Sequence, residues 1–176
     1  MADRPSLDPA ALADIAVGLA CAEPLWRAVV RHDGGERRPV RLLATDAYEV
    51  WVIGWTPGQG LELHDHGVSA GVVTVVEGEL LERTALDGRL VDDRLATGRV
   101  RWLPPGTVHA VAGSEAGPAT SIHVYSPPLV RMTRFGDDLA PLGVDVVVPE
   151  TAVLPAAAAG PLLHPAAARA RVAVDA

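Results

Sequence analysis

The stretch LELHDHGVSAGVVTVVEGEL, residues 61–80, carries the features that decide the fold. His64 and His66 are separated by one residue, and alternate side chains of an extended strand share a face, so both imidazoles are predicted to project to one side. A third histidine, His109, lies in the strand-like run WLPPGTVHAVAG, residues 102–113. Three neutral ring nitrogens that meet at one interior point suit a divalent transition metal. The sequence therefore predicts a metal site inside a barrel or sandwich.

Turn residues divide the chain from Val40 onward into short strands. Glycine or proline recurs at short intervals, at Pro57, Gly58, Gly71, Gly78, Gly88, Gly98 and Gly106. Short β-rich runs separated by turn residues are typical of an all-β sandwich or closed barrel. The pair Asp87-Gly88 predicts a hairpin turn, and residues 144–148 predict one more strand. The predicted fold is therefore mainly β.

Short helices are predicted before the strands. Asp8 is the expected N-cap and Pro9 the first helical residue, and apolar residues follow at helical spacing to about Cys21. A second short helix is predicted to extend to Val30, before a turn at residues 33–35.

The length of 176 residues fits a single domain with a sizeable core. We expect an N-terminal helical segment over residues 1–36 that packs on the barrel, and the barrel itself over residues 37–148. Residues 149–176 are rich in alanine and proline without sustained periodicity, so they are predicted to form a C-terminal tail.

Charge and composition exclude several classes of protein. The net charge is −7, the isoelectric point is near 5.3 and no lysine- or arginine-rich run occurs, so a nucleic-acid partner is not expected. Neither a membrane span of roughly 18 to 20 apolar residues nor a signal peptide is predicted. Cys21 is the only cysteine, which is typical of a reducing, cytoplasmic compartment. The sequence is compatible with a monomer and leaves the oligomeric state open.

Two spaced motifs resemble the cupin superfamily of double-stranded β-helix, or jelly-roll, barrels. They consist of Gly58, His64, His66 and Gly78, followed by Gly98, Pro104, Gly106 and His109. A typical cupin has a glutamate ligand after the paired histidines, whereas this chain has Gly71 there. Together with His-Asp-His-Gly and the later SIHVYSPP, residues 121–128, this departure is similar to the cysteine dioxygenase family, the thiol dioxygenases of bacterial type. The resemblance extends from about Val40 to Phe135.

The resemblance implies a reaction and a metal. It implies oxidation of the small thiol L-cysteine by O2 to cysteine sulfinic acid, at a non-haem Fe(II) held by His64, His66 and His109. Three uncharged ligands leave the full charge of the ion available to a thiolate, so Gly71 in the glutamate place is consistent with a thiol substrate. Asp65 faces the other side of its strand and is not expected to touch the metal.

Three polar residues of the later motif share a strand face. Ser121, His123 and Tyr125 alternate along the chain, so a regular strand brings them to one side. On strand parity alone, a purely structural arrangement is at least as compatible with the sequence as a catalytic one. In that arrangement the tyrosine packs in the interior and the histidine caps a buried hydroxyl. The resemblance implies a catalytic role, with the Tyr125 hydroxyl near substrate and O2 and His123 orienting it. Some animal relatives cross-link a cysteine to this tyrosine, but Gly71 occupies that place, so Tyr125 is expected to stay free.

Arg41 is the candidate for binding the substrate carboxylate, because a guanidinium fork matches that anion in a bidentate way. Arg37 and Arg38 are alternatives, since the segment between Arg41 and Trp55 is shorter than in animal relatives. Trp55 itself is predicted to be a core or pocket-wall residue.

Two other functions remain open. One is a dioxygenase for a thiol acid without the amine, such as 3-mercaptopropionate. Related enzymes of that kind tend to carry glutamine in place of the arginine, so Arg41 favours cysteine while Gln59 keeps the question open. The other is a metal-binding or ligand-sensing cupin without turnover, because such barrels host many functions. The row of Ser121, His123 and Tyr125 argues against it.

Overall fold

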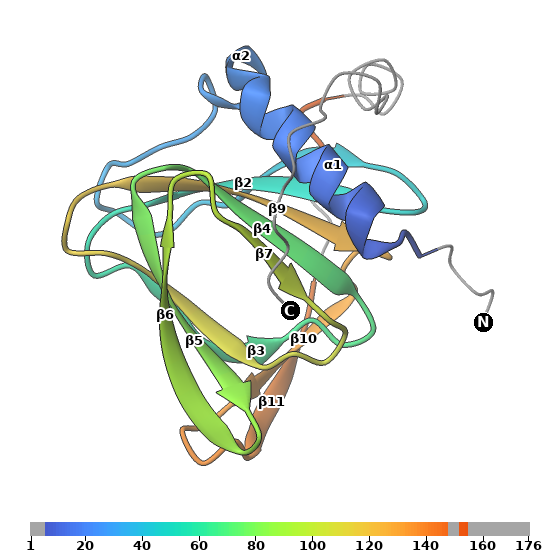
Figure 1. The fold of residues 1–176 in the computed structure, drawn as a ribbon, viewed down its shortest axis with the longest axis vertical. Helices are drawn as coiled ribbons and strands as arrows, with labels where there is room; N and C mark the ends of the chain where they lie inside the picture. The colour runs from blue at the N-terminus through green and yellow to red at the C-terminus, as the bar shows by residue number, and fades with distance from the viewer. Residues whose placement is uncertain (1–5, 148–151, 155–176) are drawn as a thin grey trace.

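The computed structural model describes residues 6–147 and 152–154, and in this part of the chain two short helices precede a series of strands (Figure 1). The helices are α1 (Pro9–Cys21) and α2 (Glu23–Trp26). The strands are β1 (Val40–Ala44), β2 (Glu49–Trp55), β3 (Gly60–Asp65), β4 (Ala70–Glu77), β5 (Glu79–Leu86), β6 (Arg89–Ala96), β7 (Val100–Leu103), β8 (His109–Gly113), β9 (Ala119–Ser126), β10 (Arg131–Phe135) and β11 (Pro141–Val146). The mainly β prediction is confirmed.

Helix α1 begins and ends where the sequence predicts. The Asp8 side chain accepts a hydrogen bond of 2.8 Å from the backbone N–H of Ala11, and Pro9 is the first helical residue. This cap satisfies one of the N–H groups that the first turn of a helix leaves without a partner. None of the described helices is long and apolar enough to cross a membrane.

Helix α2 is shorter than predicted. It ends at Trp26 and not near Val30, and the chain then turns and crosses β2. At the crossing the carbonyl oxygen of Arg31 lies so close to Gly54 that a Cβ there would overlap it. This close approach of two backbones requires glycine at this point of β2. The chain must leave the helical conformation before it reaches Arg31.

Two antiparallel sheets contain all of these strands. The five-stranded sheet has the order β1-β2-β9-β4-β7, and the six-stranded sheet has the order β11-β10-β3-β8-β5-β6. The predicted hairpin at Asp87-Gly88 joins β5 to β6, with positive φ angles of 50° and 73° at its two residues, as a two-residue hairpin turn requires. The predicted last strand is β11, which ends at Val146. Val148 and, apart from residues 152–154, the predicted tail lie outside the described residues.

Helix α1 covers the outer face of the five-stranded sheet, so the strands beneath it are buried on both faces (Figure 1). In β9 the apolar side chains of Ile122 and Val124 pack in the cluster that includes α1. The alternate residues His123 and Tyr125 line a cavity on the opposite face, inside the barrel. This division explains why a strand with polar residues at every second position has no exposed side chain.

Candidate metal centre

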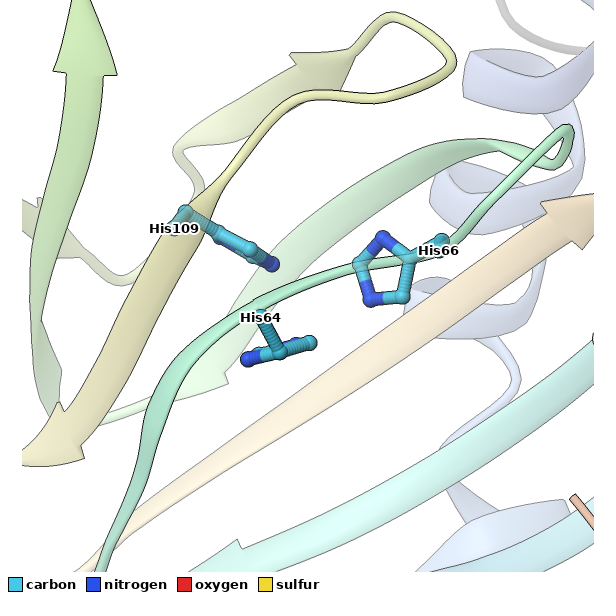
Figure 2. Close-up of side chains that lie close together, drawn as sticks. All are labelled: His64, His66 and His109. Atoms are coloured by element: carbon cyan, nitrogen blue, oxygen red, sulfur yellow. The ribbon is translucent and has the colours of Figure 1, made fainter. Parts of the chain in front are cut away.

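Three buried histidines meet at one point inside the barrel. His64 lies near the end of β3, His66 follows that strand directly, and His109 is the first residue of β8. The backbones of His64 and His109 are paired across the two strands, which brings their rings within 4.7 Å between centroids. One nitrogen of each ring lies within 4.8 Å of the others, and the side chains point toward one another (Figure 2). The cluster predicted from the sequence is therefore present.

Hydrogen bonds at the outer nitrogens orient two of these rings. Nδ1–H of His64 donates to the carbonyl oxygen of Glu62 at 2.7 Å, and Nδ1–H of His109 donates to Oε1 of Glu82 at 2.8 Å. Both rings then carry their lone pair on Nε2. Nε2 of His66 and of His109 is buried without a hydrogen-bond partner among the described residues. Such orphaned ring nitrogens are what a metal ion would satisfy, so the residues fit a metal.

The protonation of these histidines suits ligation. Burial, and after it the neighbouring His109, lowers the pKa of His64 to about 3. The same two causes hold the pKa of His66 well below its usual range. Both rings are therefore neutral at physiological pH, which is the state that binds a metal.

No carboxylate joins the cluster among the described residues. Oδ1 of Asp65 accepts from the backbone N–H of Gly67 and of Thr133, each at 3.1 Å, so this side chain faces away as predicted. Gly71, in the glutamate place of the cupin pattern, lies beside Tyr125, and a Cβ there would be 3.1 Å from two carbons of the tyrosine ring. The ring occupies the space that a side chain at this position would need.

The predicted row on β9 forms a hydrogen-bonded chain. Oγ of Ser121 lies 2.8 Å from Nε2 of His123, and Nδ1 of His123 lies 3.1 Å from the hydroxyl of Tyr125. Trp55 adds a member that the sequence did not predict, because its Nε1–H donates to Oγ of Ser121 at 2.8 Å. Trp55 is fully buried, in agreement with its predicted place in the core or pocket wall.

The donors of this chain can be assigned. Tryptophan only donates, and His123 is the other hydrogen-bond partner of the buried Ser121 hydroxyl, so the hydroxyl proton goes to Nε2 of His123. A neutral His123 then carries its proton on Nδ1 and donates it to the Tyr125 oxygen. The Tyr125 proton is left for an acceptor in the cavity. Burial raises the pKa of Tyr125 well above its usual value, so the hydroxyl stays protonated.

Acidification is expected to destabilise the metal-free protein, partly through His123. Burial, ahead of the charges of His109 and Arg37, lowers the pKa of His123 from 6.5 to about 3. Between these values the unfolded chain binds a proton that the folded chain does not, so stability is lost as the pH falls through this window. For this residue the loss is roughly 2 kcal/mol between pH 7 and pH 5. Urea unfolding of wild type and His123→Gln at both pH values measures it, and an equal loss in the two proteins would contradict it.

A cavity of about 230 Å³ opens beside the histidines. Its lining includes His64, His109, His123 and Tyr125, together with Trp51 and Trp55. Its charged lining residues, among those described, are Arg37 and Asp145. A volume of this size holds a small organic molecule.

The three candidate arginines have different environments. Arg37 lines the cavity, with its guanidinium 5.1 Å from the centre of the Trp55 ring, and burial lowers its pKa. Arg38 is exposed. Arg41, the first candidate from the sequence, forms a buried ion pair with Glu49, with 3.3 Å between Nη1 and Oε2, and is not among the cavity-lining residues. Of the three candidates, the alternative Arg37 is therefore the one that lines the cavity.

Glu82 is the residue of this centre that the sequence analysis missed. Its carboxylate is fully buried against His109 and Arg101. The one available signal was its parity with Leu80, a buried residue on the same face of β5. A charged residue in the hairpin stretch ELLERTAL is normally expected to face solvent. Only the face that it shares with Leu80 indicates that Glu82 is buried.

Comparisons with known proteins agree with this geometry. A family model described as cysteine dioxygenase type I matches residues 10–138, which include β1–β10, α2 and all of α1 except Pro9. A solved protein with a double-stranded β-helix domain from Klebsiella pneumoniae, itself described as uncharacterized, is 27% identical, with a TM-score of 0.51 over 57% of this chain and 85% of that chain. The protein TT1209 from Thermus thermophilus is 24% identical, with a TM-score of 0.52 over 58% and 93% of the two chains.

A third solved structure is a cupin 2 conserved barrel domain protein from Leptotrichia buccalis. It is 21% identical, with a TM-score of 0.50 over 57% of this chain and 45% of that chain. At this level of identity the likeness concerns the fold. The predicted cupin barrel is confirmed.

Proposed function

This chain belongs to the cysteine dioxygenase type I family, and from that premise we propose that it is a thiol dioxygenase that acts on L-cysteine at a non-haem Fe(II). The reaction adds both atoms of O2 to the sulfur of the thiol and yields cysteine sulfinic acid. The observation that carries the proposal is the cluster of His64, His66 and His109, whose imidazoles converge without a carboxylate among the described residues. When bound, ferrous iron would supply open coordination positions and the redox chemistry through which a thiolate reacts with O2.

Arg37 binds the substrate carboxylate in this proposal. A guanidinium in the cavity lining offers paired N–H donors, and its partial burial strengthens the attraction to an anion. The Trp55 ring beneath it restricts the guanidinium to one orientation. Binding the carboxylate at one end of the cavity holds the sulfur near the three histidines, so that positioning replaces chance encounter.

Tyr125 directs a hydrogen bond into the cavity. Because His123 donates to the tyrosine oxygen, the hydroxyl proton is free for an acceptor on the substrate or on O2. The Tyr125 ring packs against His66, with 4.6 Å between centroids, so the hydroxyl is carried close to the ligand cluster.

The phenylalanine variant of Tyr125 tests this role. Tyr125→Phe keeps the ring but removes the donor, and we expect kcat to fall roughly tenfold to hundredfold, the effect of one strong hydrogen bond. Iron content is expected to stay at the wild-type level, because the hydroxyl is not a ligand. Turnover and metal analysis of the same preparation measure both quantities. A variant with wild-type kcat would remove Tyr125 from the proposal.

Anaerobic loading with Fe(II), followed by addition of cysteine and O2, tests the proposed reaction. We expect one molecule of O2 consumed for each molecule of cysteine sulfinate, identified by mass spectrometry. A binding or sensing cupin without turnover would consume no O2. Production of cystine in place of the sulfinate would also exclude the dioxygenase.

The thiol acid 3-mercaptopropionate is the second candidate substrate. Gln59, which kept this option open, is occupied elsewhere, because its side chain accepts from the N–H of Thr56 and donates to the carbonyl of Gly35. Asp145, the acidic residue of the described cavity lining, forms an ion pair with Arg134 at 2.9 Å. The described lining therefore offers no unpaired carboxylate that would bind the amine of cysteine and so favour it over 3-mercaptopropionate. Values of kcat/KM for the two thiols decide between them.

A further inference from the structure

We propose that Glu82 is a positioning residue for the metal centre, which holds His109 in its ligating orientation and makes it a stronger donor than His64. The inference rests on the proposed metal site but not on the reaction performed there. Oε1 of Glu82 accepts from Nδ1–H of His109 at 2.8 Å, and the side chains of both residues are at most 1% exposed.

The contact fixes the tautomer of His109. An ionised carboxylate only accepts hydrogen bonds, so the imidazole proton must lie on Nδ1 and the lone pair on Nε2. Nε2 of His109 is one of the buried nitrogens without a partner among the described residues. Glu82 therefore determines which nitrogen of His109 faces the centre.

The charge of Glu82 distinguishes His109 from His64. The outer nitrogen of His64 donates to a neutral backbone carbonyl, at 2.7 Å, whereas that of His109 donates to a carboxylate. A hydrogen bond to an anion is stronger and raises the electron density of the imidazole, which strengthens its bond to a metal. Because no acidic side chain of the described residues joins the cluster, the Glu82 carboxylate supplies negative charge from behind the His109 ring.

Arg101 balances the buried carboxylate and joins the two sheets. Its Nε lies 2.9 Å from Oε2 of Glu82, and its side chain extends from β7 in the five-stranded sheet to β5 in the six-stranded sheet. A buried carboxylate without such a partner would be costly to desolvate. The same ion pair also leaves one orientation for the Glu82 side chain, with Oε1 toward His109.

Cobalt(II) binding tests the proposal without use of the dioxygenase reaction. We expect Glu82→Gln to weaken Co(II) binding about 10-fold to 100-fold, the usual effect of losing a partner of a metal-bound histidine. The visible absorption bands of the bound ion are expected to shift, because the ligand field of His109 weakens. Competition with a chelator gives the affinity. The control is Glu79→Gln, on the same strand, where the carboxylate pairs with the exposed Arg94 and touches no histidine of the cluster.

A second variant distinguishes a purely structural role of Glu82 from the proposed role at the metal centre. Glu82→Gln leaves the partly buried Arg101 without its anionic partner, so the double variant Glu82→Gln/Arg101→Gln removes both charges and restores a neutral pair. Weak Co(II) binding with altered spectra in the folded double variant supports the proposal. Wild-type affinity and spectra in that variant overturn it and leave Glu82 a fold-stabilising residue. A protein that binds Co(II) in this manner but forms no sulfinate would contradict the proposed reaction alone.

Discussion

Replacement of His109 by alanine is expected to abolish iron retention and thiol oxidation together. The substitution removes one of the three nitrogens that converge in the cluster and leaves two rings, too few to hold the ion against release. Loss of a metal that supplies several kcal/mol of transition-state stabilisation corresponds to a decrease in kcat/KM of about 10³-fold or more. Metal analysis after desalting and the rate of O2 uptake with cysteine measure the two effects.

His32→Gln is the matched control for this variant. His32 is an exposed histidine whose Nε2 lies 3.0 Å from the carbonyl oxygen of Ala119, and it is not part of the cluster. It is expected to retain iron and activity. If His109→Ala kept a full complement of iron and an activity within tenfold of wild type, the three-histidine centre would be wrong.

The second large effect is expected from Arg37→Gln. The substitution removes the cation that lines the cavity, and loss of a desolvated charge pair costs about 2 to 5 kcal/mol. The kcat/KM for cysteine is therefore expected to fall by about 30-fold to 5,000-fold, mainly through KM. Cysteamine, the same thiol without the carboxylate, provides an internal reference, because its turnover is expected to change little. The ratio of kcat/KM for cysteine and cysteamine is the quantity to compare.

Two other arginines serve as controls. Arg38→Gln changes an exposed neighbour and is expected to leave the ratio unchanged. Arg41→Gln breaks the buried pair with Glu49, so a lower free energy of unfolding is expected in place of a change in the ratio. If Arg41→Gln raised KM for cysteine and Arg37→Gln did not, the carboxylate would bind at Arg41, as the sequence first indicated.

The elements that the sequence predicted correctly depend on local rules. The start of α1 follows from Asp8 and Pro9, whose cap geometry involves only neighbouring residues. The hairpin at Asp87-Gly88 follows from residues that accept positive φ angles. The extent of α2 was predicted less well, because the crossing of Arg31 over Gly54 depends on a strand that lies far along the chain.

The sequence by itself determined the pair His64 and His66 and the row from Ser121 to Tyr125, because strand parity is a property of consecutive residues. The tertiary structure alone decided that Arg37, and not Arg41, lines the cavity and that Glu82 touches His109. These contacts depend on strand register and on the way the two sheets face each other. Register is set by the packing of residues distant in sequence, so no local pattern contains it.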